Sequence, residues 1–478
     1  MSFPPGKPLL VMLILAIAAG AMVAARPSPP RADLLVWVFA EEHFSAYSHP
    51  PKGEKASLTD RYQQLTGKSV RIELIATQAE DIRLVSMFMD RATGAELPDL
   101  CEIEIGSVGR YFRPGVDNVG FLPLNDFLER DHLMDKIVPG RLALWSKRDP
   151  RTGRLVIFGI PHDVNPVTLT YRKDLFDEAG IDPSTAKTWA EFQDLCLKYM
   201  AYAKSHGRGD RAAMEIPSSN PDLLVNMLRQ RHVNLVDADN HEFLDDPIVA
   251  DTLAFYTQLV AGPRRIGADA RPGTAGFVLD LAEGSVAAVI TPDWRIADIA
   301  RYAPELAGKL RMMPLPRFDP VGDAPTSSWG GTMIGIPRRS YGPSPDPDAL
   351  RRENAAWELL KFLYFSPQGL DAQSVTGILP AVRSAWAGQP ASVDPAADSL
   401  FGGQPIHKLY VDLADQIPEQ FVTPYSATAQ NELGYVLTRT VAHERARGDA
   451  GLRDACSQLL AQWAGILKAQ IQFAEGTP

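Results

Sequence analysis

The stretch from residue 159 to residue 181 decides the fold: GIPHDVNPVTLTYRKDLFDEAGI. Pro161 leads an extended segment, and the β-forming run from Val167 to Tyr171 predicts a strand. Asp174 to Ala179 then predicts a short helix, which Gly180 ends. The stretch therefore predicts an extended segment followed by a strand and a helix.

The same alternation continues on both sides of this stretch. Thr188 and Glu191 have the spacing of a capping box at the start of an apolar-periodic helix. Short apolar runs predict strands at 34–39, 70–75, 98–105, 155–160, 286–290 and 333–336, and helical spacing predicts helices at 81–95 and 353–365. The last third is predicted to be mainly helical. Strands that alternate with helices are typical of βαβ units, so the fold class is α/β with a largely parallel sheet.

The composition is that of a soluble globular protein. Hydrophobic residues make up 45% of the 478 residues, charged residues make up 22%, and the formal net charge is -10. A nucleic-acid-binding surface would need a basic stripe, so no nucleic-acid partner is expected.

The first 25 residues have the pattern of an export signal. Lys7 precedes an uncharged run from Leu9 to Ala25, and the small residues Val23 and Ala25 sit before a plausible cleavage point. The run is at the lower length limit for spanning a bilayer, so an uncleaved N-terminal anchor is the competing interpretation. We expect a periplasmic or other extracytoplasmic location. No cysteine lies near the end of the run, so a lipoprotein is not expected.

Three cysteines occur, Cys101, Cys196 and Cys456, each beside an apolar residue. Because the count is odd, at least one stays free or pairs between chains. Buried thiols that act as small hydrophobes are expected, and the sequence leaves a single disulfide open.

The stretch at 159–181 resembles the central signature of the family 1 extracellular solute-binding proteins, the maltose-binding type. Arg172 stands where the family usually has Asn, at a position we expect on the surface. Four further segments are similar to family motifs in the same order, namely 283–294, 328–336, 355–363 and 376–383. Five motifs in order span about half of the chain.

The resemblance implies a periplasmic-binding-protein type II-like fold, in which two α/β lobes are joined by a hinge with the ligand cleft between them. Lobe 1 would comprise 33–163 plus 328–367, and lobe 2 would comprise 166–315 plus 380–478. Hinge crossings would fall at 161–166, 316–329 and 368–379. The lobes would close around a ligand by bending at these crossings.

The function that the resemblance implies is capture of a small solute, a sugar or oligosaccharide, for an ABC importer. The expected partners are ABC permease subunits, and a monomer with no cofactor is expected. Two alternatives stay open: a module that feeds a membrane signalling receptor, and a glycan-active enzyme. No nucleophile elbow or phosphate-binding loop occurs, and no clustered metal ligands can be assembled from the sequence.

Aromatic planes fit the C–H face of a sugar ring. Trp294 follows a predicted strand and matches the family's stacking position, so it is the first candidate for ligand contact. Trp329 precedes Gly330, where the backbone can come close to a ligand.

Polar candidates would accept hydrogen bonds from sugar hydroxyls. They are Glu104 at a strand end, Asp163 and Asn165 at the first crossing, Glu41 in a loop expected at 40–43, and Tyr425 near the C-terminal region. For each, a solvated loop or core packing is the alternative reading. Glu102 and Glu104 would share one strand face, whereas glycosidase carboxylates flank the scissile bond from opposite sides.

Overall fold

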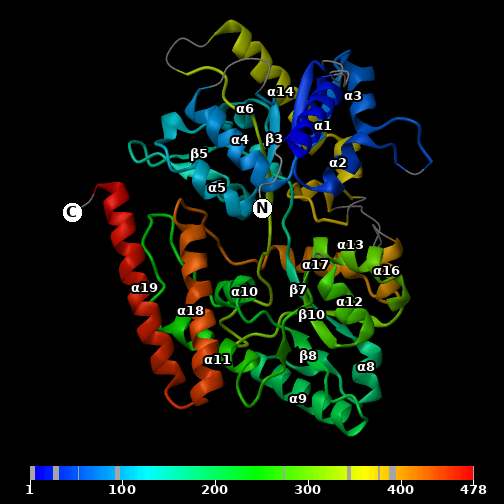
Figure 1. The fold of residues 1–478 in the computed structure, drawn as a ribbon, viewed down its shortest axis with the longest axis vertical. Helices are drawn as coiled ribbons and strands as arrows, with labels where there is room; N and C mark the ends of the chain where they lie inside the picture. The colour runs from blue at the N-terminus through cyan, green and yellow to red at the C-terminus, as the bar shows by residue number, and fades with distance from the viewer. Residues whose placement is uncertain are drawn as a thin grey trace.

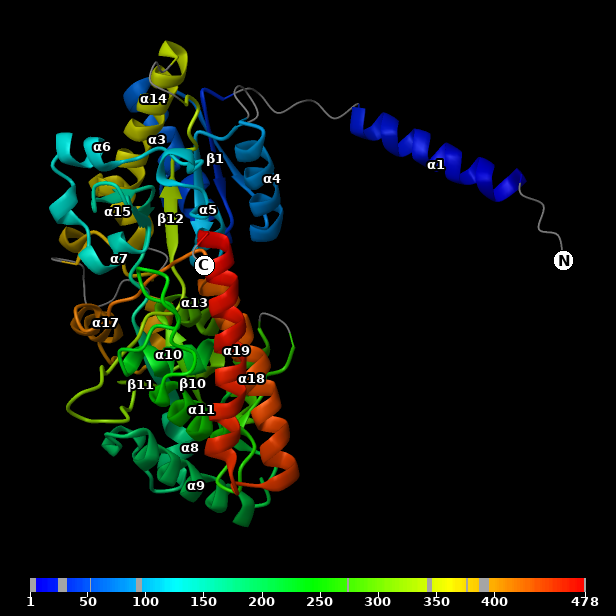
Figure 2. The same cartoon turned by 90° about the vertical axis from the view of Figure 1, so that its left-hand side faces the viewer.

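The computed structural model describes residues 6–24, 32–51, 53–91, 97–272, 275–341, 346–374, 377–386 and 395–476, and it shows two α/β lobes (Figure 1). Helix α1 (Gly6–Ala24) lies apart from both lobes (Figure 2). Within the described residues, no helix has the length and apolar character needed to cross a membrane. The expected cleavage position at Ala25 lies outside the described residues.

The first lobe is built on a five-stranded sheet with strand order β2-β1-β3-β12-β6. β1 pairs in parallel with β2 and β3, whereas β12 runs antiparallel to β3 and β6. The apolar run of β1 is buried as the sequence predicts, because helices cover the sheet. The strands are β1 (Leu34–Val38), β2 (Val70–Leu74), β3 (Leu100–Glu104), β6 (Ile160–Pro161) and β12 (Thr332–Gly335).

Helices pack on this sheet, and a hairpin of β4 (Ser146–Arg148) and β5 (Leu155–Ile157) extends the lobe. The long helix was predicted to begin near 353 but begins earlier, at Pro347, because Asp346 caps its first turn. The helices are α2 (Glu41–Ser48), α3 (Leu58–Thr66), α4 (Thr77–Met89), α5 (Ile105–Tyr111), α6 (Asn125–Arg130), α7 (Pro139–Ala143), α14 (Pro347–Phe365) and α15 (Pro367–Ser374).

The second lobe has a five-stranded sheet with strand order β11-β7-β10-β8-β9. β10 lies between β7, to which it is antiparallel, and β8, to which it is parallel. The sheet is therefore mixed rather than largely parallel, because the chain enters and leaves this lobe through antiparallel neighbours. The strands are β7 (Val167–Arg172), β8 (Ala212–Glu215), β9 (Gly267–Ala268), β10 (Val286–Pro292) and β11 (Leu310–Pro314).

The predicted capping box is present at the start of α9, where Thr188 accepts from the Glu191 N–H and the Glu191 carboxylate accepts from the Thr188 N–H. The C-terminal helices α18 and α19 lie side by side along this lobe (Figures 1 and 2). The helices are α8 (Lys173–Glu178), α9 (Trp189–Ser205), α10 (Asp222–Gln230), α11 (Pro247–Val260), α12 (Gly276–Glu283), α13 (Asp293–Tyr302), α16 (Pro395–Leu400), α17 (Ile406–Ala414), α18 (Ser426–Arg447) and α19 (Leu452–Glu475).

Three segments of chain lie together between the lobes. The first pairs with the second through a bridge between Pro166 and Ser328, and with the third through a bridge between Asp163 and Pro380. The chain at 316–325 belongs to the second lobe, where the Ala324 N–H donates to the Gln230 carbonyl. Helix α15 packs on α14 in the first lobe.

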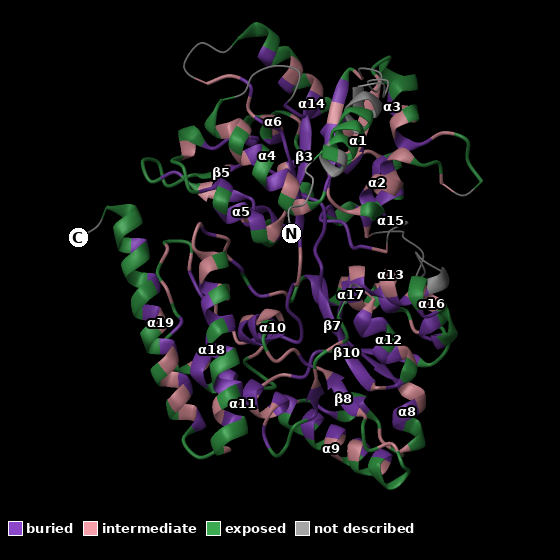
Figure 3. Cartoon of the chain, in the orientation of Figure 1, coloured by how far each residue is buried: buried purple, intermediate pink, exposed green. Residues whose placement is uncertain are grey.

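Apolar clusters pack against both sheets: one lies within the second lobe, one within the first, and a third contains residues of both lobes. The inner strands of both sheets are largely buried (Figure 3), whereas the edge strand β2 is partly exposed. Trp37, Trp189 and Trp357 lie in these clusters and are at most 4% exposed. Arg172 corrects an expectation: it is buried, not on the surface. Its guanidinium donates to the carbonyl oxygens of Leu281 and Ala282 and pairs with Asp174. These acceptors replace the hydrogen bonds to water that the guanidinium loses on burial.

Candidate functional site

A cavity of about 480 Å³ lies between the two lobes and is lined by residues of both. This volume falls in the range of small-molecule sites. Six of the eight residues selected from the sequence line it, namely Trp294, Trp329, Glu104, Asp163, Asn165 and Gly330. They come from β3, α13 and the crossing segments, so the fold brings together positions that are far apart in the sequence.

Trp294 and Trp329 meet at the second-lobe side of this cavity. The Trp294 indole N–H donates to the Trp329 carbonyl at 3.1 Å, and the two ring centroids are 5.8 Å apart at an interplanar angle of 75°. Trp294 lies in the first turn of α13, which follows β10 directly, so the ring projects from the end of a strand. Neither ring is fully buried, which leaves indole surface for a bound molecule.

Position 330 favours glycine because the Trp294 indole and the Asn165 amide lie close to its backbone. Its φ of 94° lies in the left-handed region, and a Cβ atom there would stand 3.1 Å from the Trp294 ring nitrogen and 3.2 Å from the Asn165 side-chain nitrogen. A Cβ atom at this position would crowd both groups, so the indole and the amide would have to move by a few tenths of an ångström.

Asn165 lies in the first crossing with a φ of 54° and is 3% exposed. Its side-chain oxygen has no hydrogen-bond partner within the described part of the chain. Buried polar atoms usually have partners, so an unpaired acceptor that lines a cavity indicates a ligand group or water.

Arg141, which the sequence analysis missed, joins the crossing segments. Its guanidinium donates to the Ser328 hydroxyl at 2.8 Å, to the Asp163 carbonyl at 3.1 Å and to the Gly330 carbonyl at 3.3 Å, and it pairs with the Asp163 carboxylate at 3.4 Å. Burial alone would raise the pKa of Asp163, but the His162 and Arg141 contacts outweigh it and hold that pKa below its usual range. Asp163 is therefore an ionised part of the junction.

Glu102 is sealed beneath the cavity and does not line it. Its carboxylate pairs with His43 Nδ1 at 2.7 Å and accepts from the hydroxyls of Tyr47 at 3.0 Å and Tyr364 at 3.1 Å. Burial opposes both charges, but their pairing raises the pKa of His43 and lowers the pKa of Glu102. His162, whose ring centroid is 3.9 Å from that of His43, is buried and has a lowered pKa because of that burial. His162 is thus a crossing residue and not a surface one.

Glu104 extends from the end of β3 into the cavity wall. Its carboxylate caps α5 by accepting from the Gly106 N–H at 2.8 Å. Burial, helped by the charges of Asp81, Asp222 and Asp163, raises its pKa to about 7. The shift makes this carboxyl sensitive to the charge of whatever binds beside it.

Glu41 and Tyr425 are not among the residues that line this cavity. The expected loop at 40–43 is instead the start of helix α2, so Glu41 faces solvent and Glu42 takes the lining position. Tyr425 is half-buried against the core of the second lobe, and Gln430, further along on α18, reaches the cavity.

Glu42 belongs to the segment at 40–43 that the sequence analysis expected near the cleft. Several other polar lining residues escaped that analysis, among them Asp222, Asn226, Arg229 and Asp298. Asp298 lies four positions after Trp294 on α13, so helical spacing puts both on one face and could have identified it. No comparable signal marks Asp222 or Arg229 on α10.

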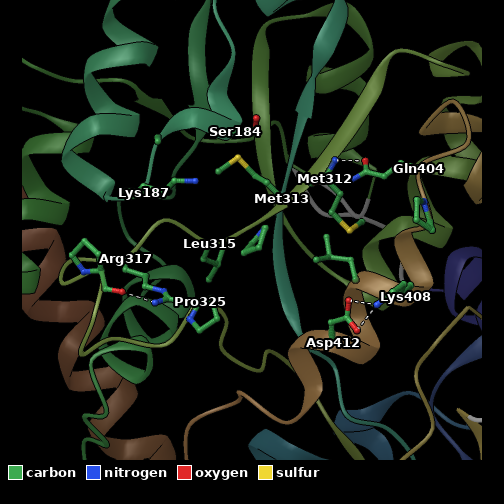
Figure 4. Close-up of a pocket in the computed structure, with 15 residues that line it drawn as sticks. Ser184, Lys187, Met312, Met313, Leu315, Arg317, Pro325, Gln404, Lys408 and Asp412 are labelled. Carbon is green, nitrogen blue, oxygen red and sulfur yellow. Dashed lines mark hydrogen bonds and ion pairs between the residues drawn. The ribbon is translucent and has the colours of Figure 1, made fainter.

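A larger cavity of about 630 Å³ lies on the second lobe between β11 and α17 (Figure 4). Met312, Met313 and Leu315 make it apolar, and Gln404 pairs with both backbone groups of Met312, which closes this edge of the sheet. Only second-lobe residues line it, so a solute there would not bridge the lobes. The inter-lobe cavity is therefore the candidate site. Among the described residues, no group of three or more His, Cys, Asp or Glu is placed to hold a metal ion.

Two lobes on separate sheets, three crossing segments and a lined cavity between them define a binding protein of the periplasmic type II architecture, as expected from the sequence. The family described as bacterial extracellular solute-binding protein matches residues 58–399, and the chain belongs to this family.

Curated relatives and solved structures agree with this assignment. The arabinooligosaccharide-binding protein of Bacillus subtilis is 23% identical over 418 residues, 86% of this chain and 87% of that protein. Its counterpart in Halalkalibacterium halodurans is 21% identical over 403 residues, 84% of this chain and 82% of that protein. The ABC transporter associated binding protein of B. animalis subsp. lactis Bl-04, solved with β-1,6-galactobiose, has a TM-score of 0.66 at 17% identity and covers 91% of this chain and 98% of its own.

Proposed function

We propose that this chain is the substrate-binding component of an ABC importer and captures a sugar or oligosaccharide by lobe closure. The observation that carries the proposal is the cavity lined by both lobes, in which two indole rings lie beside carboxylate and amide side chains. Indole faces pack against the C–H face of a sugar, and oxygen groups accept from its hydroxyls. The names of the relatives support the same ligand class.

In this proposal the Trp294 and Trp329 rings stack against the sugar ring. Glu104, Asp163 and Asn165 accept hydrogen bonds from its hydroxyl groups. Gly330, which has no side chain, lets the backbone approach the ligand. A ligand that touches both lobes favours the closed arrangement over the open one. The three crossing segments would bend to allow this movement, because they are the chain connections between the lobes that lie around the site.

Binding without catalysis fits the carboxylates near the site. Glu102, the only carboxylate that shares a strand with Glu104, has no exposed surface and all its contacts are with His43, Tyr47 and Tyr364. It is therefore out of reach of a glycosidic bond. The relatives are likewise binding proteins.

The partners would be permease subunits in the membrane, which would recognise the closed pair of lobes. Because the family is one of extracellular proteins, the chain would act outside the cytoplasm, either free in the periplasm or tethered by its N-terminal segment. We propose that it works as a monomer, since each chain contains both lobes of a complete site.

The test is a thermal-shift screen of the purified chain against mono- and oligosaccharides, since a ligand specific to the folded form raises the melting temperature. The best compound should bind with 1:1 stoichiometry in calorimetry and reduce the radius of gyration in X-ray scattering as the lobes close. Failure of every sugar to raise the melting temperature, or turnover of a sugar into product, would contradict the proposal.

A further inference from the structure

The inter-lobe cavity carries more negative charge than a neutral sugar requires. Four of its carboxylates, Glu42, Glu104, Asp222 and Asp298, form no ion pair with any described lysine, arginine or histidine. Asp163 is the exception, because Arg141 pairs with it. Carboxylates can accept from the hydroxyls of a neutral sugar, but like charges gathered in one cavity repel one another, and an uncharged solute does not relieve that repulsion.

One guanidinium faces these four carboxylates. Arg229 lines the cavity, donates to the Ser328 carbonyl at 2.9 Å and has no carboxylate partner within ion-pair distance in the described chain. Apart from Asp163, which pairs with Arg141, and His43, which pairs with Glu102, these four carboxylates and Arg229 carry a formal charge of -3 when all are ionised. A single arginine therefore does not make this cavity suitable for a phosphate or a carboxylate.

The carboxylates come from opposite lobes. The first lobe supplies Glu42 on α2 and Glu104 at the end of β3. The second lobe supplies Asp298 on α13 and Asp222 on α10. Burial raises the pKa of Asp298, and the charge of Glu42 adds to that rise. Burial and the charge of Asp222 act in the same direction on Glu104. The carboxylates of the two lobes therefore repel each other across the site, although Arg295 and Arg301 offset part of the charge at Asp298 and Arg229 offsets part of the charge at Asp222.

Neutral acceptors complete the wall. The side-chain oxygens of Asn165 and Asn226 have no partner within the described residues, although these residues are 3% and 1% exposed. The Asn226 amide donates to the Asp222 carbonyl at 2.9 Å, which fixes its oxygen as the unpaired atom. The wall also holds donors, namely the Arg229 guanidinium, the His43 ring and side-chain amides, and the Gln430 amide already donates to the Asp222 carboxylate at 2.6 Å. The two asparagine oxygens remain free to accept from a ligand.

On the basis of the function proposed above, we infer that the preferred ligand is a carbohydrate that carries a protonated amine, such as an amino sugar or an aminocyclitol glycoside. Its ammonium group would lie between Glu42 and Asp298, where it would neutralise the repulsion between the lobes. Its hydroxyl groups would donate to Asn165, Asn226 and Glu104. The hydrogen bonds from the ammonium group to the two carboxylates are charge-assisted, and such bonds are about twice as strong as neutral ones.

The experiment offers the purified chain matched sets of one sugar skeleton: glucose, glucosamine, N-acetylglucosamine and glucuronic acid, the galactose series, and cellobiose with chitosan disaccharide. Calorimetry gives each Kd. The amino compounds should bind at least about tenfold tighter than their neutral and N-acetylated counterparts, in line with the strength of hydrogen bonds to charged groups. The uronic acids should not bind.

Charge-removing variants test the assignment of residues. Glu42→Gln and Asp298→Asn should each weaken the amino compound by about tenfold and leave the neutral sugar nearly unchanged. Glu41→Gln is the matched control, because Glu41 is the neighbouring carboxylate on α2 that does not line the cavity. It should bind like the unaltered chain.

Two failures are distinguishable. If neutral or acidic sugars bind as tightly as the amino compounds, or if amino compounds do not bind while neutral ones do, the inference is overturned and the proposed sugar-binding function stands. If no sugar of any charge raises the melting temperature, the proposed function fails and this inference fails with it.

Discussion

The indole nitrogen of Trp294 donates to the carbonyl oxygen of Trp329 at 3.1 Å, so a residue at the start of α13 is tied to a chain crossing between the lobes. The same two rings also line a smaller cavity of about 320 Å³ within the second lobe. The pair therefore forms a wall with space on both sides. Removal of either ring would change the shape of the site as well as its contact area.

Trp294→Ala should weaken binding of the best sugar by about 2 kcal/mol, roughly thirtyfold, because central aromatic residues dominate binding energy. Calorimetry measures the change. The matched control is Trp463→Ala, which removes an indole stacked on Tyr435, because neither ring lines the inter-lobe cavity. Equal affinity in Trp294→Ala and the unaltered chain would show that the ring does not contact ligand.

Gly330→Ala should destabilise the chain by about 2–4 kcal/mol, because it adds left-handed backbone strain to a clash with the Trp294 ring. Gly403→Ala is the matched control, since Gly403 has a φ of 84° with nothing within 4 Å of a Cβ atom. It should cost only the backbone part, about 1–2 kcal/mol. Denaturant unfolding of both variants gives the comparison; equal losses would mean that the crowding at Gly330 is relieved without cost.

Much of the fold was predictable, because strand and cap signals are local. The capping box at Thr188 and the buried run of β1 depend on neighbouring residues alone. Burial of Arg172 and the role of Arg141 were not predictable, since the carbonyl oxygens that receive each guanidinium come from distant segments.

The site was predictable in part for the same reason. Trp294 follows a recognisable strand, whereas Asp222 faces Glu104 only after two separate lobes have folded and come together. The confusion of Glu41 with Glu42 has a simpler cause. In the loop that the sequence analysis expected, the directions of successive side chains are not fixed. In helix α2 neighbouring side chains point about 100° apart, so only Glu42 reaches the cavity.

The thiols should be inert in the native chain. Cys101, Cys196 and Cys456 are free and fully buried, and burial raises the pKa of each. A thiol reagent should therefore detect none of them until denaturant is added and then all three, and a reductant should leave Tm unchanged. Ser205→Cys on the exposed end of α9 is a positive control that should react at once. Fewer than three thiols in the denatured, unreduced chain would reveal a disulfide.

The His43–Glu102 pair should stabilise the first lobe in a defined pH range. The raised pKa of His43 gives stability that is lost as pH rises above its ordinary 6.5, and the lowered pKa of Glu102 gives stability that is lost as pH falls below its ordinary 4.5. Glu102→Gln should cost about 3–5 kcal/mol, most strongly between these values, because it leaves a buried cation unpaired. Chemical unfolding across pH measures the difference; a constant difference would exclude an ionic pair.

Acidity should affect the empty and the occupied site in opposite ways. The pKa of Glu104 is raised to about 7, so its neutral form favours the folded state, and this stability is lost as pH rises through 7. A ligand hydroxyl that donates to Glu104, together with the positive charge of the ammonium group in the same cavity, would instead favour the carboxylate, so binding near pH 7 should release protons. Calorimetry in buffers of different ionisation enthalpy measures that release, and Glu104→Gln should reduce it. Unchanged release in this variant would assign the protons to another group, and uptake of protons would contradict a cationic ligand.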